Sequence, residues 1–269
     1  MIGKRPRLIA AFPTLLTLGN GACGFACITF AAKVGPEPTD ANHLLIAALF
    51  IFLGMLFDAL DGSAARLTNQ TTEFGAELDS LCDAITFGVA PAFLMLQFSR
   101  DYHGRFLWVC GVLYLLCALM RLARFNAETE EDDDHEVFSG LPSPGAASVV
   151  ASFPLAMRGA KDLAENSDAW AQQIGEWLIP AMMISLPLFT VVIALLMVSR
   201  FRYPHVFNQL VKQKRSRRQV IQMVIGVVFV YAVRELAIPI LFCYFAFATP
   251  IAAGWKELVA GRLYKSKKV

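Results

Sequence analysis

Charged residues are scarce in this chain of 269 residues. Only 17% of them are Asp, Glu, Lys or Arg, whereas 56% are apolar, and the mean hydropathy is +0.51. A soluble domain carries about 25% charged and about 45–50% apolar residues, so this chain lacks the polar groups to cover a globular surface. The composition argues against a disordered chain, a secreted disulfide scaffold and a soluble nucleic-acid-binding domain. It predicts an integral membrane protein.

Several enzyme motifs are also missing. The four histidines are scattered and form neither a catalytic triad nor a metal-binding pair. There is no Walker-type phosphate loop, no Rossmann glycine pattern and no basic-aromatic pattern for nucleic acid. The six cysteines all fall within apolar stretches, where a thiol behaves as a small hydrophobic group. Neither a hydrolase triad nor a zinc or redox site is therefore predicted, and no nucleic-acid partner is expected.

Long apolar runs are what the sequence does contain. A helix needs about 20 apolar residues to cross a membrane, and the runs lack the alternation of a membrane β-barrel. We predict an all-α helical bundle of about eight spans, with six or seven as alternatives because the last two share one apolar stretch. The predicted spans are residues 13–33, 43–65, 76–98, 105–125, 143–160, 177–199, 218–233 and 235–254.

The basic residues predict an orientation and a division of the chain. Most of the 24 Lys and Arg residues fall on the same side as the N-terminus, and such a bias marks the cytoplasmic side. Both termini are therefore expected in the cytoplasm, with the chain in the inner cell membrane. We predict a six-span core over 1–199, a basic cytoplasmic loop over 200–217 that binds anionic membrane lipids, and a C-terminal helical pair with a basic tail over 218–269. The acidic segment 128–136 is expected to be a solvated loop.

Four aspartates lie at the ends of two apolar runs. Asp58 and Asp61 close the second predicted span, and Asp79 and Asp83 open the third. Spacings of three and four residues place each pair on one face of its helix, and a short connection lets the two pairs face each other. Ionised side chains in a span are costly, and converging carboxylates repel, so a divalent cation is the natural partner. The alternative is that these aspartates cap helices and bind water.

Together with small neighbours and one arginine, the aspartates follow a single spacing. The sequence matches D-x2-D-G-x2-A-R-x8-G-x3-D-x3-D at every position, with Asp58, Asp61, Gly62, Ala65, Arg66, Gly75, Asp79 and Asp83. This pattern resembles the signature of the CDP-alcohol phosphatidyltransferases, and the resemblance covers the first six predicted spans. It implies a membrane-embedded transferase, typically a homodimer, that cleaves the pyrophosphate of a CDP-linked lipid and releases CMP.

The resemblance also implies roles for individual residues. Asp58, Asp61 and Asp79 would bind two divalent ions, Mg²⁺ or Mn²⁺, and Asp83 would be both a metal ligand and the base that deprotonates the attacking hydroxyl. The residues expected to contact the CDP-lipid are Asn20, Gly62, Ala65, Arg66, Thr72 and Gly75. Small residues allow phosphates to approach the backbone, and an arginine supplies a cation. For Asn20, a hydrogen bond between helices is the alternative.

Two further segments resemble the phosphatidylserine synthase branch of this family. They are RLARFN, residues 121–126, and FSGLPSPGAA, residues 138–147. The resemblance implies that CDP-diacylglycerol donates its phosphatidyl group to L-serine, and Arg121 or Arg124 is a candidate to bind the serine carboxylate. Both arginines are alternatively charges that set the orientation in the membrane.

The sequence is also compatible with two other functions. One is a phosphatidyltransferase for another alcohol, glycerol 3-phosphate or choline. The other is a cation transporter, which would place its carboxylates near the middle of the membrane and show internal repeats. No repeat is visible here, and the aspartates cluster toward one face.

Overall fold

Helices make up nearly all of the chain that the structure, a computed structural model, describes. The described residues are 7–35, 40–68, 72–102, 104–129, 140–199, 237–248 and 250, and none of them is in a strand. The elements are α1 (Arg7–Ala31), α2 (Asp40–Thr68), α3 (Glu73–Asp83), the π-helix η1 (Ala84–Val89), α4 (Ala90–Phe98), α5 (Gly104–Thr129), α6 (Ser143–Ala164), α7 (Ala169–Val198) and a shorter helix, Ala237–Ala248. The predicted all-α bundle is confirmed.

Five helical segments in the described part are long and apolar enough to cross a membrane. They are Phe12–Ala31, Asn42–Ala64, Glu73–Phe98, Gly104–Ala127 and Ala169–Val198. Each overlaps a predicted span, although Ala169–Val198 begins earlier than the predicted 177–199, and the five support an integral membrane protein. The count of eight spans is not confirmed, because the predicted span 218–233 lies outside the described residues, as do the basic loop 200–217, the C-terminal tail and most of the acidic segment.

The predicted span 143–160 forms helix α6, which is less apolar than the five. Its residues from Ser143 to Ala160 are mostly buried against other helices. Two of its fully buried hydroxyls are satisfied within the helix, because Ser148 donates to the Gly145 carbonyl at 2.7 Å and Ser152 to the Val149 carbonyl at 2.6 Å. A helix surrounded by protein needs no continuous apolar face toward lipid, which explains its lower hydropathy.

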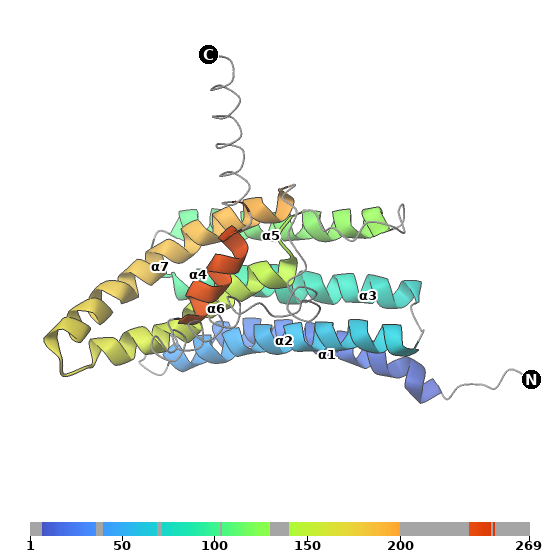
Figure 1. The fold of residues 1–269 in the computed structure, drawn as a ribbon, viewed down its shortest axis with the longest axis horizontal. Coiled ribbons are helices and arrows are strands. Elements are labelled where there is room, and N and C mark those ends of the chain that lie inside the picture. The colour runs from blue at the N-terminus through green and yellow to red at the C-terminus, as the bar shows by residue number, and fades with distance from the viewer. Residues whose placement is uncertain are drawn as a thin grey trace, which may run out of the picture.

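The helices pack side by side in one bundle. Figure 1 shows α1 and α2 along one edge, α5 and α7 along the other, and α3, α4 and α6 between them. The C-terminal end of α2 and the N-terminal end of α3 lie at the same end of the bundle (Figure 1). Large buried side chains fill the interior, among them Ile51, Phe87, Tyr114 and Leu186. This arrangement brings the two predicted aspartate pairs to one end.

The third span changes its helix type directly after Asp83. Residues Ala84–Val89 form a π-helix before the α-helix resumes. Pro91 explains the change, because it has no N–H for the Phe87 carbonyl four residues earlier and its ring crowds that carbonyl. The fully buried Tyr114 hydroxyl donates to the Phe87 carbonyl instead, at 3.1 Å. A side chain of α5 thus stabilises the irregular turn.

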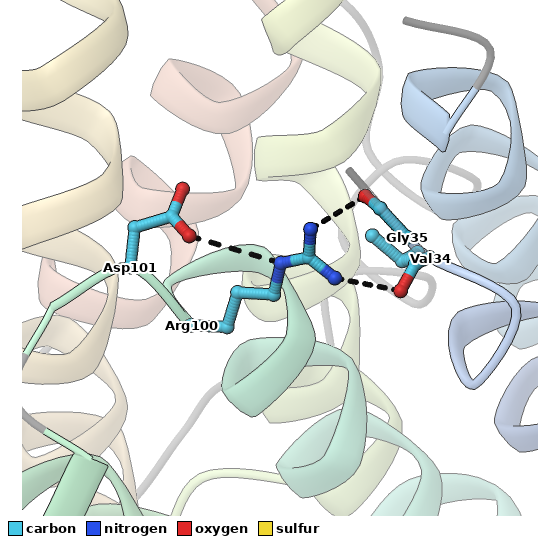
Figure 2. A network of polar contacts seen from close by, with 4 residues as sticks. All are labelled: Val34, Gly35, Arg100 and Asp101. Atoms are coloured by element: carbon cyan, nitrogen blue, oxygen red, sulfur yellow. Dashed lines mark hydrogen bonds and ion pairs between the residues drawn. The ribbon is translucent and has the colours of Figure 1, made fainter. Parts of the chain in front are cut away.

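Arg100 joins two connections at the end of the bundle away from the aspartates. Its guanidinium donates to the carbonyl of Val34, at 2.6 Å, and to that of Gly35, both just beyond α1 (Figure 2). Oδ1 of Asp101 lies 3.8 Å from Nε of Arg100. These bonds satisfy carbonyls left open after the last turn of α1, so α1 and α4 are held together at this end.

Gly140 joins the start of α6 to the end of α7. Its φ of +89° lies in the left-handed region, and a Cβ there would be 2.3 Å from the Met197 carbonyl oxygen. The next residue, Leu141, donates its N–H to the Leu196 carbonyl at 3.1 Å. Only glycine fits this position without moving the backbone.

We expect Gly140→Ala to destabilise the protein by at least about 1–2 kcal/mol, because of the left-handed backbone and the collision with Met197. The measurement is the thermal unfolding midpoint in detergent. Gly104→Ala is the matched control, because a Cβ at Gly104 meets open space. Equal midpoints for the two variants would contradict the expectation.

Candidate metal centre and active site

Three aspartates from two helices converge at one end of the bundle. Asp58 and Asp61 come from α2 and Asp79 from α3, and one carboxylate oxygen of each lies within 4.8 Å of the others. Asp61 is buried, with 5% of its surface exposed, and the other two are half-buried. The predicted meeting of the two helix faces is thus seen for these three residues.

Two oxygens of this cluster have no hydrogen-bond donor in the described part of the chain. They are Oδ2 of Asp61 and Oδ1 of Asp79, and both are buried. A buried carboxylate oxygen without a donor is costly, and three carboxylates this close repel one another. Oxygen ligands at short mutual distances are what a divalent cation such as Mg²⁺ or Mn²⁺ requires. The residues present therefore fit a divalent metal ion.

Asp83 follows one helical turn after Asp79 and is held by α1. Nδ2 of Asn20 donates to Oδ1 of Asp83 at 2.9 Å, and Asn20 is fully buried. Asp83 lies within electrostatic range of Asp58, Asp79 and Asp61 but is not one of the three clustered carboxylates. Its place as a further metal ligand stays a prediction. For Asn20, the alternative of a hydrogen bond between helices is what the structure contains.

Arg121, one of the two arginines predicted to bind serine, comes from α5. It lies within electrostatic range of Asp83 and Asp58. Its Nη1 donates to Oγ of Ser143, the fully buried first residue of α6, at 2.7 Å. Arg121 and Ser143, one residue from each of the two segments 121–126 and 138–147, are therefore in contact close to the aspartates.

Arg124 has a different environment. Its Nη1 donates to the Val198 carbonyl at 3.3 Å, at the C-terminal end of α7. A cation there donates to a carbonyl that has no partner within the helix, and it interacts favourably with the negative end of the helix dipole. Of the two candidates for a serine carboxylate, Arg121 lies within electrostatic range of the aspartates, whereas Arg124 bonds the end of α7.

The end of the segment 121–126 is fixed to α3. Asn126 donates from Nδ2 to Oγ of Ser80 at 2.9 Å, and Ser80 is the neighbour of Asp79. Sequence reasoning missed this pair, although an amide at the end of an apolar helix indicates a polar partner. The contact connects α5 to the helix that carries two of the aspartates.

Two of the residues predicted to contact the CDP-lipid, Gly62 and Thr72, are exposed near this end of the bundle. Gly62 is exposed, and a Cβ on it would meet nothing within 4 Å, so there is space next to Asp61. The hydroxyl of Thr72 accepts the Gly75 N–H at 3.0 Å and caps α3. The side chains of Ala65 and Arg66 lie outside the described residues, so these two positions stay predictions.

The fold and this centre together define a polytopic membrane protein with a carboxylate cluster at one end of its helical bundle. Residues 10–187 match the family model for CDP-alcohol phosphatidyltransferase. This chain therefore belongs to the CDP-alcohol phosphatidyltransferase family.

Curated relatives agree with the family match. A CDP-diacylglycerol–serine O-phosphatidyltransferase of Helicobacter pylori is 32% identical over 194 residues, 72% of this chain and 72% of the relative. Proteins with the same name in Bacillus subtilis and Mycobacterium bovis are 36% and 37% identical, over 52% and 58% of this chain and 75% and 53% of their own lengths. The chain thus spans about half the length of the mycobacterial relative.

A solved structure also resembles the chain. It is a Mycobacterium tuberculosis phosphatidylinositol phosphate synthase in complex with manganese and citrate, with a TM-score of 0.41 and 20% identity over 77% of this chain and 90% of that chain.

Asp61→Asn should weaken Mn²⁺ binding to the purified protein by at least about tenfold, or about 1.4 kcal/mol, because it removes a charge from the buried cluster. Isothermal titration calorimetry of the protein in detergent measures this change. Asp101→Asn is the control, since Asp101 is exposed at the opposite end of the bundle. Unchanged Mn²⁺ affinity in Asp61→Asn would contradict a metal centre at this cluster.

Proposed function

We propose that this chain transfers the phosphatidyl group of CDP-diacylglycerol to L-serine, which gives phosphatidylserine and CMP. The observation that carries the proposal is the convergence of Asp58, Asp61 and Asp79 next to Asp83. These residues stand at the spacing of the family pattern, inside the matched range. The names of the curated relatives support serine as the acceptor.

The aspartate cluster is proposed to hold one or two divalent ions, Mg²⁺ or Mn²⁺. Asp58, Asp61 and Asp79 supply the oxygens, and the two buried oxygens without donors are the natural ligands. A bound ion neutralises charge on the pyrophosphate and on the leaving CMP. The protein contributes a fixed set of carboxylates from two helices, so the ligands are oriented before the substrate binds.

Asp83 is proposed to act as the general base. Asn20 occupies Oδ1 of Asp83, which leaves Oδ2 to take a proton. The serine hydroxyl oxygen bonds to the phosphorus of the phosphatidyl group, and its proton passes to Asp83. The bond between that phosphorus and the bridging pyrophosphate oxygen breaks, and CMP leaves with the electron pair. Holding the base and the phosphate together makes the attack effectively intramolecular.

The nucleotide end of the CDP-lipid is proposed to occupy the open side at Gly62. The absence of a side chain there lets a phosphate approach the backbone of α2 next to Asp61. Ala65 and Arg66 follow on the same helix, and Thr72 and Gly75 begin α3 across the connection. A phosphate bound between these two helix ends would lie next to the carboxylate cluster.

Arg121 is proposed to bind the carboxylate of serine. Its guanidinium uses Nη1 for Ser143 and lies near Asp83, so further N–H groups remain for a carboxylate. A serine bound there would present its hydroxyl toward the proposed base. Arg124 is proposed to stabilise the end of α7 instead.

The proposal extends to the setting of the enzyme. The bias of basic residues supports an aspartate end that faces the cytoplasm across the inner cell membrane. The homodimeric state typical of the family is part of the same proposal.

The purified protein in detergent, with CDP-diacylglycerol and Mg²⁺ or Mn²⁺, should release CMP when serine is added. Asp83→Asn should lower turnover by at least about a hundredfold, in the range of general-base catalysis, and retain CDP-lipid binding. Release of CMP only with glycerol 3-phosphate or choline would select the other acceptor. No release with any alcohol would exclude the transferase.

Arg121→Gln should raise the KM for serine by at least about tenfold, because it removes the cation for the carboxylate. The KM for CDP-diacylglycerol should change by less than about twofold. Arg124→Gln is the matched control, with lower thermal stability and an unchanged serine KM. Equal effects of Arg121→Gln on both KM values would refute the assignment.

A further inference from the structure

Thr86 and Asp83 both bond to one residue of α1. The Oγ1 hydroxyl of Thr86 donates to the backbone carbonyl of Asn20 at 2.8 Å, and the side chain of Asn20 donates to Asp83 at 2.9 Å. Thr86 and Asn20 are both fully buried. These two hydrogen bonds and the short chain segment from Asp83 to Thr86 therefore link the three residues in a closed loop.

The side chain of Thr86 fits between two glycines on different helices. A Cβ on Gly24 of α1 would be 2.6 Å from Oγ1 of Thr86, and one on Gly54 of α2 would be 2.5 Å from its Cγ2. Neither contact is possible for a real side chain, so both positions require glycine. The hydroxyl of Thr86 lies against α1 and its methyl group lies against α2. The helices α1, α2 and η1 therefore meet at this residue.

The backbone around Thr86 lacks the regularity that fixes an ordinary helix. Thr86 lies within η1, where the α-helical bonding pattern is interrupted. The Phe87 carbonyl depends on the Tyr114 hydroxyl, so side chains from neighbouring helices hold this turn. The bond from Thr86 to α1 then helps to fix the position of Asp83, the residue directly before η1, relative to the cluster.

We propose that Thr86 is a positioning residue for the transfer reaction, acting through Asn20 to hold Asp83 in line with the attacking hydroxyl. This inference rests on the proposed function, in which Asp83 is the base. Displacement of a catalytic group by about 1 Å costs on the order of a hundredfold in rate. The hydroxyl of Thr86, and not only its volume, is then required for turnover.

Two substitutions separate the hydroxyl from the volume. Thr86→Val keeps the shape and removes the donor, whereas Thr86→Ser keeps the donor and removes the methyl group next to Gly54. We expect Thr86→Val to lower kcat by at least about tenfold, with both KM values within about twofold, because a displaced base slows the chemical step and not binding. Thr86→Ser should keep kcat within about threefold of the natural protein.

A matched control is available on α7. Thr190 is also fully buried, and its hydroxyl donates within its own helix, to the Leu186 carbonyl at 2.8 Å. Thr190→Val removes the same group away from the proposed site and should leave kcat unchanged. A Thr86→Val protein that does not fold where Thr190→Val folds would assign Thr86 to packing and overturn the proposal.

A double variant tests the route through Asn20. If Thr86 acts through Asn20, Thr86→Val should add less than about twofold to the loss of kcat in Asn20→Ala, because coupled residues are not additive. Additive losses would overturn the proposed route. Full kcat in Thr86→Val, or a lower kcat in Thr86→Ser than in Thr86→Val, would overturn the positioning role.

The same assay distinguishes this inference from the proposed function. Absence of CMP release by the natural protein with every alcohol tested would overturn both. Release with serine by the natural protein, together with an unaffected Thr86→Val, would leave the transferase intact and reject the role of Thr86 alone.

Discussion

Repulsion among carboxylates at one end of an apolar bundle is the constraint on which the rest of the structure depends. Asp58, Asp61 and Asp79 lie too close together to be stable as bare ions in a poorly hydrated place. Any arrangement that keeps them there must supply compensating positive charge and rigid support. The cluster fits a cation, Asn20 bonds the neighbouring Asp83, and Arg121 lies within electrostatic range of Asp83 and Asp58. A cation at the cluster, the amide of Asn20 and the guanidinium of Arg121 would each compensate part of this negative charge.

Support for the cluster comes from unusually close helix packing. A Cβ on Gly21 would be 2.9 Å from Sγ of Cys82, and Gly24 and Gly54 make room for Thr86. Small residues let apolar helices approach until polar side chains can bond across them. Lipid supplies no hydrophobic drive for this association, so packing and interhelical hydrogen bonds hold α1, α2 and α3 together. The glycines therefore permit the close packing that brings these side chains together.

Much of the fold and part of the site could be predicted from the sequence. Spacings of three and four residues place Asp58 with Asp61 on one face, and the short connection brings Asp79 to them. The rotation of each helix about its axis is not contained in such spacings. This rotation determines that Arg121 bonds to Ser143 whereas Arg124 bonds to the end of α7. It also determines that Thr86 bonds to Asn20. Pro91 and the glycines around Asn20 were signals of the irregular turn, but their partners depend on tertiary packing.

Helix α6 differs from its neighbours in a way that bears on how the protein is made. Its buried serines, together with Arg158 and Lys161 toward its C-terminal end, make α6 less hydrophobic than the five apolar spans. A segment of this kind gains little by leaving the translocation machinery for lipid on its own. The hydrogen bond from Arg121 and the packing of α6 on α7 provide stabilisation that its low hydropathy does not. Stable placement of α6 in the bilayer is therefore expected to depend on helices synthesised both before and after it.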